Sequence, residues 1–174
     1  MDYYRYDARY VLGRDHSGRR NASFWGWICG EFPGTLVPIE RRLNAEQYVR
    51  ILDDALICTV TAAFGDDEVL NILEDNSPVH TAHIVTEWFD ANPRFNRLPL
   101  PPRSPDINII ENVWAEMVRE WTPTMAPTAE QMHARVNEAW ENLRDRQNFF
   151  NTLADSVPRR LQKIINVQGA HINY

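Results

Sequence analysis

The sequence contains few cysteines and no long apolar run. Its 174 residues include two cysteines, Cys29 and Cys58, and neither a CxxC pair nor a Cys/His spacing typical of zinc sites. We therefore expect buried free thiols and no disulfide. No run of eighteen apolar residues and no N-terminal apolar signal segment occurs. The sequence therefore predicts a soluble, intracellular protein with no membrane partner.

Positive charge is outweighed by negative charge, with 18 Lys and Arg against 24 Asp and Glu. The formal net charge is −6, which argues against strong capture of DNA by this chain alone, because contacts from Lys and Arg to phosphate supply most non-specific affinity. Eight of the 18 Lys and Arg residues lie within residues 1–20 or 159–174, and none lies between Arg50 and Arg94. We consider five of them as candidates for contact with nucleic acid or a partner, with a solvated surface as the alternative: Arg19, Arg20, Arg159, Arg160 and Lys163.

The length and the patterning predict one domain. We expect residues 1–20 to form a polar arm or linker and residues 21–174 to form the domain. Alternating aromatic residues predict a strand over 23–29, and Phe32-Pro33-Gly34 predicts a turn into a second strand over 35–39. Capping boxes at 44–47 and 128–131 predict the starts of two helices. Ser156 and Pro158 predict the start of a last helix.

The segment from Val69 to Trp121 contains the main candidate functional residues. Val69 to Leu73 has the pattern of a buried strand and is followed by Glu74, Asp75 and Asn76. Open α/β sheets place their chemistry at this carboxyl edge of the strands. A helix is expected from Ser77, with Ile84, Val85, Trp88 and Phe89 on its apolar face. By strand alternation Glu74 should point to the opposite face from Asp75, which makes Glu74 a poor substitute ligand.

A second acid begins the next predicted helix. Apolar residues recur at helical spacing from Ile110 to Trp121, and Glu111 lies in the first turn of that helix. Asp75 and Glu111 are thus each expected at the entrance of a helix that packs on the same sheet.

These two segments resemble a known family. DNSPVHTA and PPRSPDINIIENVWAEMVR resemble the second and third acidic blocks of the mariner-type DDE transposases, in which Asp75 and Glu111 match the two acids residue by residue. The spacing between them is one residue longer than is commonest in the family, and Ile109 replaces the usual Pro. The resemblance implies an α/β fold of the ribonuclease H-like type, with a mixed sheet flanked by helices.

The resemblance also implies a metal-dependent chemistry. Cleavage and joining of DNA by these transposases requires Mg²⁺ or Mn²⁺ held by three acids, and hard divalent cations prefer carboxylate oxygens. The first of these acids is expected on a central strand upstream of residues 23–29, where residues 1–20 instead resemble the segment that follows that strand. The expected fold is thus N-terminally truncated. We expect the empty position to be filled by Tyr3 to Leu12, by a second copy of the chain in a homodimer, or by a strand from another protein.

Neighbouring polar residues have candidate supporting roles. Asn76 and Asn112 directly follow the matched acids and could orient them by hydrogen bonding. His80 is placed by the resemblance close to the acid cluster, and a structural role is favoured over that of a catalytic base. Asp106 is better explained by a turn than by metal ligation.

Three functions follow from these observations. The favoured one is a domesticated, transposase-derived domain without independent catalysis that acts in protein interaction or dimerisation. The second is a Mg²⁺- or Mn²⁺-dependent DNA endonuclease and strand transferase, with Asp2 or Asp7 as the third acid. The third is a non-specific nucleic-acid binder. In a eukaryote, transposition predicts a nuclear location.

Overall fold

The computed structural model describes residues 22–40, 42–101, 104, 106–119 and 128–167. The chain divides into two compact units. The first comprises Met1–Arg42 with Ile109–Ser156, and the second comprises Leu43–Asn108 with Val157–Tyr174. The predicted empty position, its proposed occupant Tyr3 to Leu12, and Asp2 and Asp7 lie outside the described residues.

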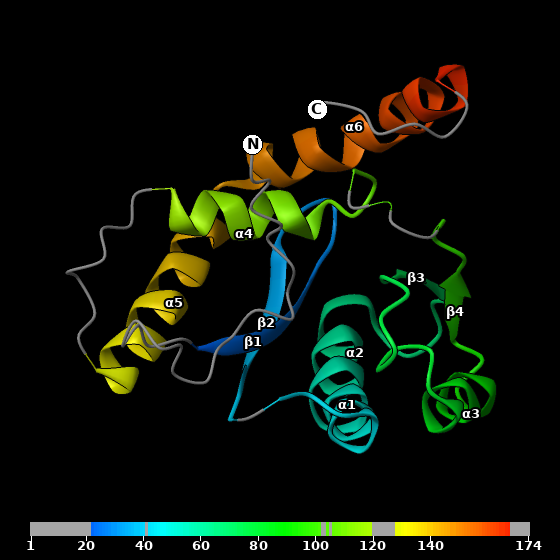
Figure 1. Ribbon diagram of the computed structural model, residues 1–174, viewed down its shortest axis with the longest axis horizontal. Coiled ribbons are helices and arrows are strands. Elements are labelled where there is room, and N and C mark those ends of the chain that lie inside the picture. Colours follow the sequence, from blue (N-terminus) through cyan, green and yellow to red (C-terminus); the bar gives the residue numbers. More distant parts are fainter. Residues whose placement is uncertain (1–21, 41, 102–103, 105, 120–127, 168–174) are drawn as a thin grey trace. The chain divides into compact units, whose positions relative to one another are not determined.

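The first unit is built on a β-hairpin. Strands β1 (Ser23–Ile28) and β2 (Pro33–Ile39) pair antiparallel, with a register shift between Gly26 and Ile28. Helices α4 (Ile110–Val118) and α5 (Ala129–Arg144) accompany the hairpin (Figure 1), as does the part of α6 (Gln147–Asn166) that ends at Ser156. The predicted capping box at the start of α5 is confirmed, because Thr128 and Gln131 hydrogen-bond reciprocally.

The core of this unit lies between the hairpin and the helices. Trp140 is 1% exposed, stacks on Trp114 with ring centroids 5.3 Å apart, and donates from Nε1 to the Gly34 carbonyl oxygen at 3.1 Å. The remaining buried side chains of this core are Val113, Met117, Leu143, Phe150 and Leu153. Helix α5 is therefore fixed to the hairpin by apolar packing and by a hydrogen bond that satisfies the buried indole.

Gly34 leaves no room for a side chain. A Cβ atom on this residue would lie 2.0 Å from Cε2 of Trp27. We expect Gly34→Ala to displace that indole and to lower the free energy of unfolding by about 1–3 kcal/mol, the usual cost of overpacking. Gly30→Ala is the matched control, because its Cβ would approach Ala154 only to 3.3 Å. Equal urea midpoints for the two variants would contradict the account.

The second unit contains a pair of parallel strands with helices beside them. Three helical segments follow one another: α1 (Ala45–Ile51), the π-helix η1 (Leu52–Ile57) and α2 (Cys58–Phe64). Strands β3 (Leu70–Leu73) and β4 (Phe95–Leu98) pair in parallel and are connected through α3 (His83–Ala91). Asn44 caps α1 as predicted, accepting a hydrogen bond from Gln47 N at 2.8 Å. The most buried side chains here include Tyr48, Leu52, Leu56, Val60 and Val85.

The segment after β3 differs from its prediction. Helix α3 begins at His83 rather than Ser77, and Ser77 to Ala82 form a separate turn closed by Thr81 N donating to Ser77 O. Asp75 therefore precedes a turn and not a helix. Strand β3 is not buried either, because Val69 and Leu73 are 63% and 37% exposed and, within the described part of the chain, β3 pairs only with β4. Ile84, predicted on the apolar face of α3, is 37% exposed.

Two further predictions were wrong. The last helix does not start at Ser156, because α6 runs from Gln147 with Pro158 inside it. Proline removes one backbone donor from a helix. The helix nevertheless continues through Pro158, because apolar residues recur at helical spacing on both sides of it. Cys58 is exposed and Cys29 half-buried, although both are free thiols as expected.

Candidate functional site

Asp75 lies just beyond the carboxyl end of β3, as predicted. Its Oδ1 accepts a hydrogen bond from Ser77 N at 3.0 Å and lies 2.8 Å from Nδ1 of His80. Its side chain is 34% exposed. The turn that replaces the predicted helix thus folds back on Asp75 and fixes the orientation of the carboxylate.

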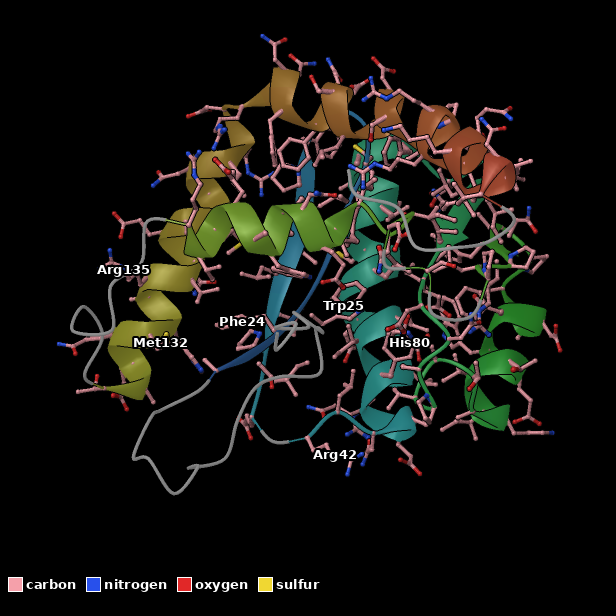
Figure 2. All side chains as sticks on the ribbon, turned by 45° about the horizontal axis from the view of Figure 1, so that its top comes forward. Phe24, Trp25, Arg42, His80, Met132 and Arg135 are labelled. Carbon is pink, nitrogen blue, oxygen red and sulfur yellow. The ribbon has the colours of Figure 1, made fainter. Side chains whose placement is uncertain are left out.

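His80 is held on several sides. Its ring lies against that of Tyr48 from α1, with centroids 4.6 Å apart, and its backbone oxygen accepts from Nη2 of Arg97 at 2.9 Å. Figure 2 shows His80 on the segment beside α1. The imidazole is therefore packed and hydrogen-bonded within the second unit.

Glu74 carries a buried carboxylate. Its side chain is 8% exposed; Oε2 accepts from the Tyr48 hydroxyl, and Oε1 lies 2.7 Å from Nε of Arg97. This second contact is an ion pair without the alignment of a hydrogen bond. Arg97 reaches Glu74 because the parallel register places it beside Ile72. Both carboxylate oxygens of Glu74 are thus engaged within the second unit, one by Tyr48 and the other by Arg97.

The environment shifts both ionisable groups in the same direction. Burial raises the pKa of Glu74 by more than the nearby His80, Tyr48 and Arg97 lower it. Burial lowers the pKa of His80, but the hydrogen bond to Asp75 and the charges of Glu74 and Asp75 outweigh it, so the pKa of His80 is raised above 6.5. Both groups therefore hold their protons more tightly than in an unfolded chain.

These shifts predict how stability depends on pH. A raised pKa in the folded state contributes stability below the unfolded pKa and loses it as the pH rises through the folded pKa. For the metal-free protein we expect the His80 contribution to be complete below pH 6.5 and to decline above it, while Glu74 acts in the same direction from pH 4.5 upward. Urea unfolding in EDTA at several pH values checks this. A decline above pH 6.5 that is identical in wild type and His80→Asn would contradict it.

Glu111 lies in the first turn of α4, as predicted. Its Oε2 is buried and its side chain is half-buried. A carboxylate at the N-terminus of a helix is stabilised by the helix dipole. Glu111 belongs to the first unit and Asp75 to the second.

The other predicted residues have varied surroundings. Nδ2 of Asn76 donates to Leu100 O at 2.6 Å, which ties the segment after β3 to the segment after β4. The backbone N of Asn112 donates to Ile109 O. Asp106 is buried, 3% exposed, and its backbone oxygen accepts from Nη1 of Arg160 at 2.9 Å.

The candidate contact residues differ in exposure. Arg160 is 6% exposed, so its guanidinium is used inside the second unit rather than presented to a ligand. Arg159 and Lys163 are exposed, and Arg19 and Arg20 lie outside the described residues.

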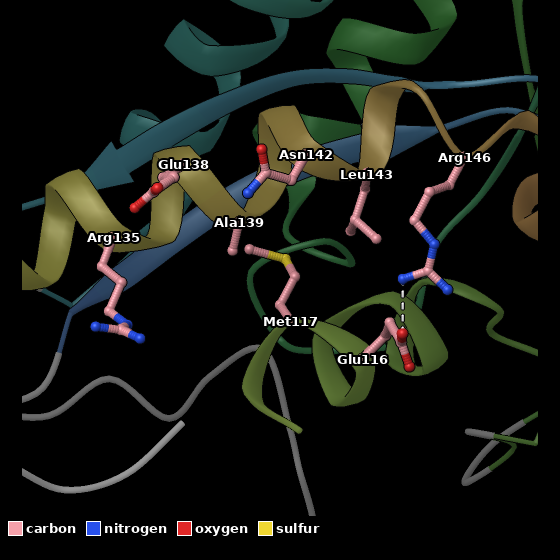
Figure 3. A pocket seen from close by; sticks show the side chains of 8 residues that line it. All are labelled: Glu116, Met117, Arg135, Glu138, Ala139, Asn142, Leu143 and Arg146. Carbon is pink, nitrogen blue, oxygen red and sulfur yellow. Dashed lines mark hydrogen bonds and ion pairs between the residues drawn. The ribbon is translucent and has the colours of Figure 1, made fainter. Parts of the chain in front are cut away.

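A cavity of about 240 Å³ lies in the first unit between α4 and α5. Figure 3 shows Met117, Ala139 and Leu143 at its apolar side and an ion pair between Glu116 and Arg146 at one end. The Arg146 Nη1 to Glu116 Oε1 distance is 2.6 Å. This cavity contains neither of the matched acids.

Comparison with known proteins identifies the family. The family model described as DDE superfamily endonuclease matches residues 3–133. The chain belongs to this family. The mariner-type resemblance is therefore confirmed.

The relatives of this DDE-family chain are transposases. It is 30% identical over 170 residues to the Tcb1 transposase of Caenorhabditis briggsae and 28% identical over 177 residues to the Tc3 transposase of Caenorhabditis elegans. These alignments include 98% and 99% of this chain, but 60% and 52% of the two relatives. The chain thus spans little more than half the length of the transposases that it matches.

Solved structures confirm the ribonuclease H-like α/β fold. The Mos1 mariner transposase catalytic domain matches with a TM-score of 0.73 at 18% identity, covering 87% of this chain and 76% of that one. The Mos1 paired-end complex with left transposon end matches with a TM-score of 0.80 at 17% identity, covering 99% of this chain and 51% of that one. The Mos1 catalytic domain has also been solved with Mg and with Mn.

The two matched acids of this DDE-family chain have the kind of donor atom that these cations bind. Asp75 and Glu111 offer carboxylate oxygens, the donors that Mg²⁺ and Mn²⁺ prefer. Among the described residues, no three His, Cys, Asp or Glu side chains are grouped to hold a metal ion, and no helix is long and apolar enough to cross a membrane.

Sequence reasoning missed Tyr48 and Arg97. Neither residue was among the candidates predicted from the sequence. The signal available for Arg97 was a charged residue beside the apolar Phe95 and Leu98, since a charge in an apolar segment needs a partner when it is buried.

Proposed function

We propose that Asp75 and Glu111 are ligands of divalent metal ions in a domain that cleaves and joins DNA phosphodiester bonds. The placement of Asp75 carries this proposal. The carboxylate follows the end of β3, is oriented by Ser77 and His80, and keeps a partly exposed side chain. Membership of the DDE endonuclease family and the match of Glu111 to the third acidic position support it.

The two acids would have complementary tasks. Bound Mg²⁺ or Mn²⁺ would activate the attacking oxygen and stabilise the leaving oxygen of the phosphodiester. Asp75 would provide a preoriented ligand from the sheet edge, while Glu111 would provide a second carboxylate from a helix start. A third carboxylate is proposed from the sequence at Asp2 or Asp7. A transposon end, as in the Mos1 paired-end complex, is the proposed substrate, with a homodimer as the proposed assembly.

Nicking of supercoiled plasmid tests this function. We expect the purified protein to nick DNA with Mn²⁺ or Mg²⁺ and not in EDTA. Glu111→Gln should reduce nicking by more than about 100-fold, because it removes a charged ligand while keeping the shape of the side chain. Glu138→Gln is the matched control, since Glu138 is an exposed glutamate on α5. Asp2→Asn and Asp7→Asn, tested in parallel, identify the third acid.

Absence of nicking by the wild-type protein would overturn the proposal. The interaction or dimerisation module would then be the better explanation. If Glu111→Gln nicked DNA as fast as the wild type, Glu111 would not be a ligand of the catalytic metal ions.

A further inference from the structure

The surroundings of Asp75 contain a connected set of side chains that the metal chemistry alone does not require. We define the Glu74 cluster as Tyr48, Glu74, His80 and Arg97. They come from three elements: α1, the segment after β3, and β4. Glu74 bonds Tyr48 and pairs with Arg97, while Arg97 and Tyr48 each contact His80.

Arg97 is itself held in place. Besides its contacts with Glu74 and the His80 backbone, its guanidinium carbon lies 5.4 Å from the ring centroid of Phe89 in α3. Phe89 is 7% exposed. A guanidinium that is fixed by a carboxylate, an aromatic face and a carbonyl has little freedom, so its contact with the His80 backbone is rigid.

The contacts of the imidazole determine where its proton lies. Nδ1 of His80 is 2.8 Å from Asp75 Oδ1 and 3.2 Å from the Asp75 backbone oxygen. A carboxylate and a carbonyl oxygen are both acceptors, so Nδ1 carries the proton and donates it. His80 therefore cannot act as a base through Nδ1. Its role at this nitrogen is to hold Asp75.

We propose that His80 is a positioning residue for Asp75, and that the Glu74 cluster keeps it in place. Tyr48 and Arg97 fix the imidazole by its face and its backbone, and Nδ1–H fixes the Asp75 carboxylate in the orientation needed for metal binding. The metal part of this inference rests on the proposed function. The hydrogen bond and the proton position do not.

NMR of the metal-free protein tests the proton position without any activity. Long-range ¹H–¹⁵N correlation of the histidine rings, at a pH where His80 is neutral, should show the proton on Nδ1. His133 provides the comparison, because its ring packs edge-on against that of Phe24, with centroids 5.2 Å apart, rather than against a carboxylate. An unprotonated Nδ1 in His80 would overturn the proposal whether or not the protein cleaves DNA.

Variants at His80 test the effect on metal use. We expect His80→Ala to raise the Mn²⁺ concentration needed for half-maximal nicking by about 10- to 100-fold, the usual effect of removing a group that orients a ligand. His80→Asn should need a Mn²⁺ concentration close to that of the wild type, because the Asn amide can donate from the position of Nδ1. His80→Gln should need as much Mn²⁺ as His80→Ala, because the Gln amide lies one bond farther from the backbone. His83→Ala is the matched control.

The outcomes separate the two proposals. Wild-type protein that fails to nick DNA contradicts the proposed function. Wild-type protein that nicks, with His80→Ala showing an unchanged Mn²⁺ requirement, contradicts the positioning role. Equal losses in His80→Asn and His80→Ala would also contradict it, and would indicate that His80 acts through Nε2.

Discussion

Replacing Trp140 by Ala should lower the free energy of unfolding by about 3–5 kcal/mol, the cost of truncating a large buried aromatic side chain. The residue is 1% exposed and packs in the core of the first unit. The variant would lose the stacking on Trp114 and would leave the Gly34 carbonyl without the indole donor. The lost stacking adds to the cost of the cavity, whereas the Gly34 carbonyl oxygen still accepts from Nη2 of Arg144 at 3.2 Å.

Hydrogen exchange locates this effect within the chain. Amides of β1 and β2 should exchange faster in Trp140→Ala, because α5 would keep only the Arg144 hydrogen bonds to Pro33 O and Gly34 O and would lose most of its packing on the hairpin. Trp140→Phe should show a smaller effect, since it keeps most of the apolar area and loses the hydrogen bond. A fall of less than about 1 kcal/mol in Trp140→Ala would mean that this residue is not at the centre of a packed core.

Asp75→Asn should reduce metal-dependent nicking by more than about 100-fold. Removal of groups that only orient metal ligands typically costs 10- to 100-fold, so loss of a charged ligand should cost more. The amide keeps the size of the side chain, and its oxygen can still accept from Ser77 N. Stability should therefore change much less than activity.

Asp90→Asn is the matched control for this variant. Asp90 is exposed on α3 in the same unit. Nicking rates at saturating Mn²⁺ and urea midpoints should be measured for both variants. If Asp75→Asn and Asp90→Asn retained equal activity, Asp75 would not be a metal ligand.

Local sequence patterns predicted several elements correctly because their causes are local. The capping residues Asn44 and Thr128 bond backbone groups three residues away, so their effect can be predicted from spacing alone. Glu111 was placed in the first turn of α4 for the same reason: the apolar spacing after it fixes where the helix starts.

Contacts between segments that are distant in the sequence could not be predicted from local patterns. The pairing of Arg97 with Glu74 depends on the parallel register of β3 and β4, and the Tyr48 contact depends on how α1 packs. The late start of α3 has a related cause. His80 bonds Asp75 five residues before it, which favours a turn over a helix at Ser77. Burial of Arg160 likewise results from its bond to Asp106, 54 residues away.

We propose that Asp75 and Glu111 both take part in one metal-dependent reaction. A double-variant cycle of nicking rates tests it most directly. Groups that act as one unit lose activity non-additively. We predict that Asp75→Asn combined with Glu111→Gln is no slower than the slower single variant. Losses that multiply, as for independent sites, would contradict the claim.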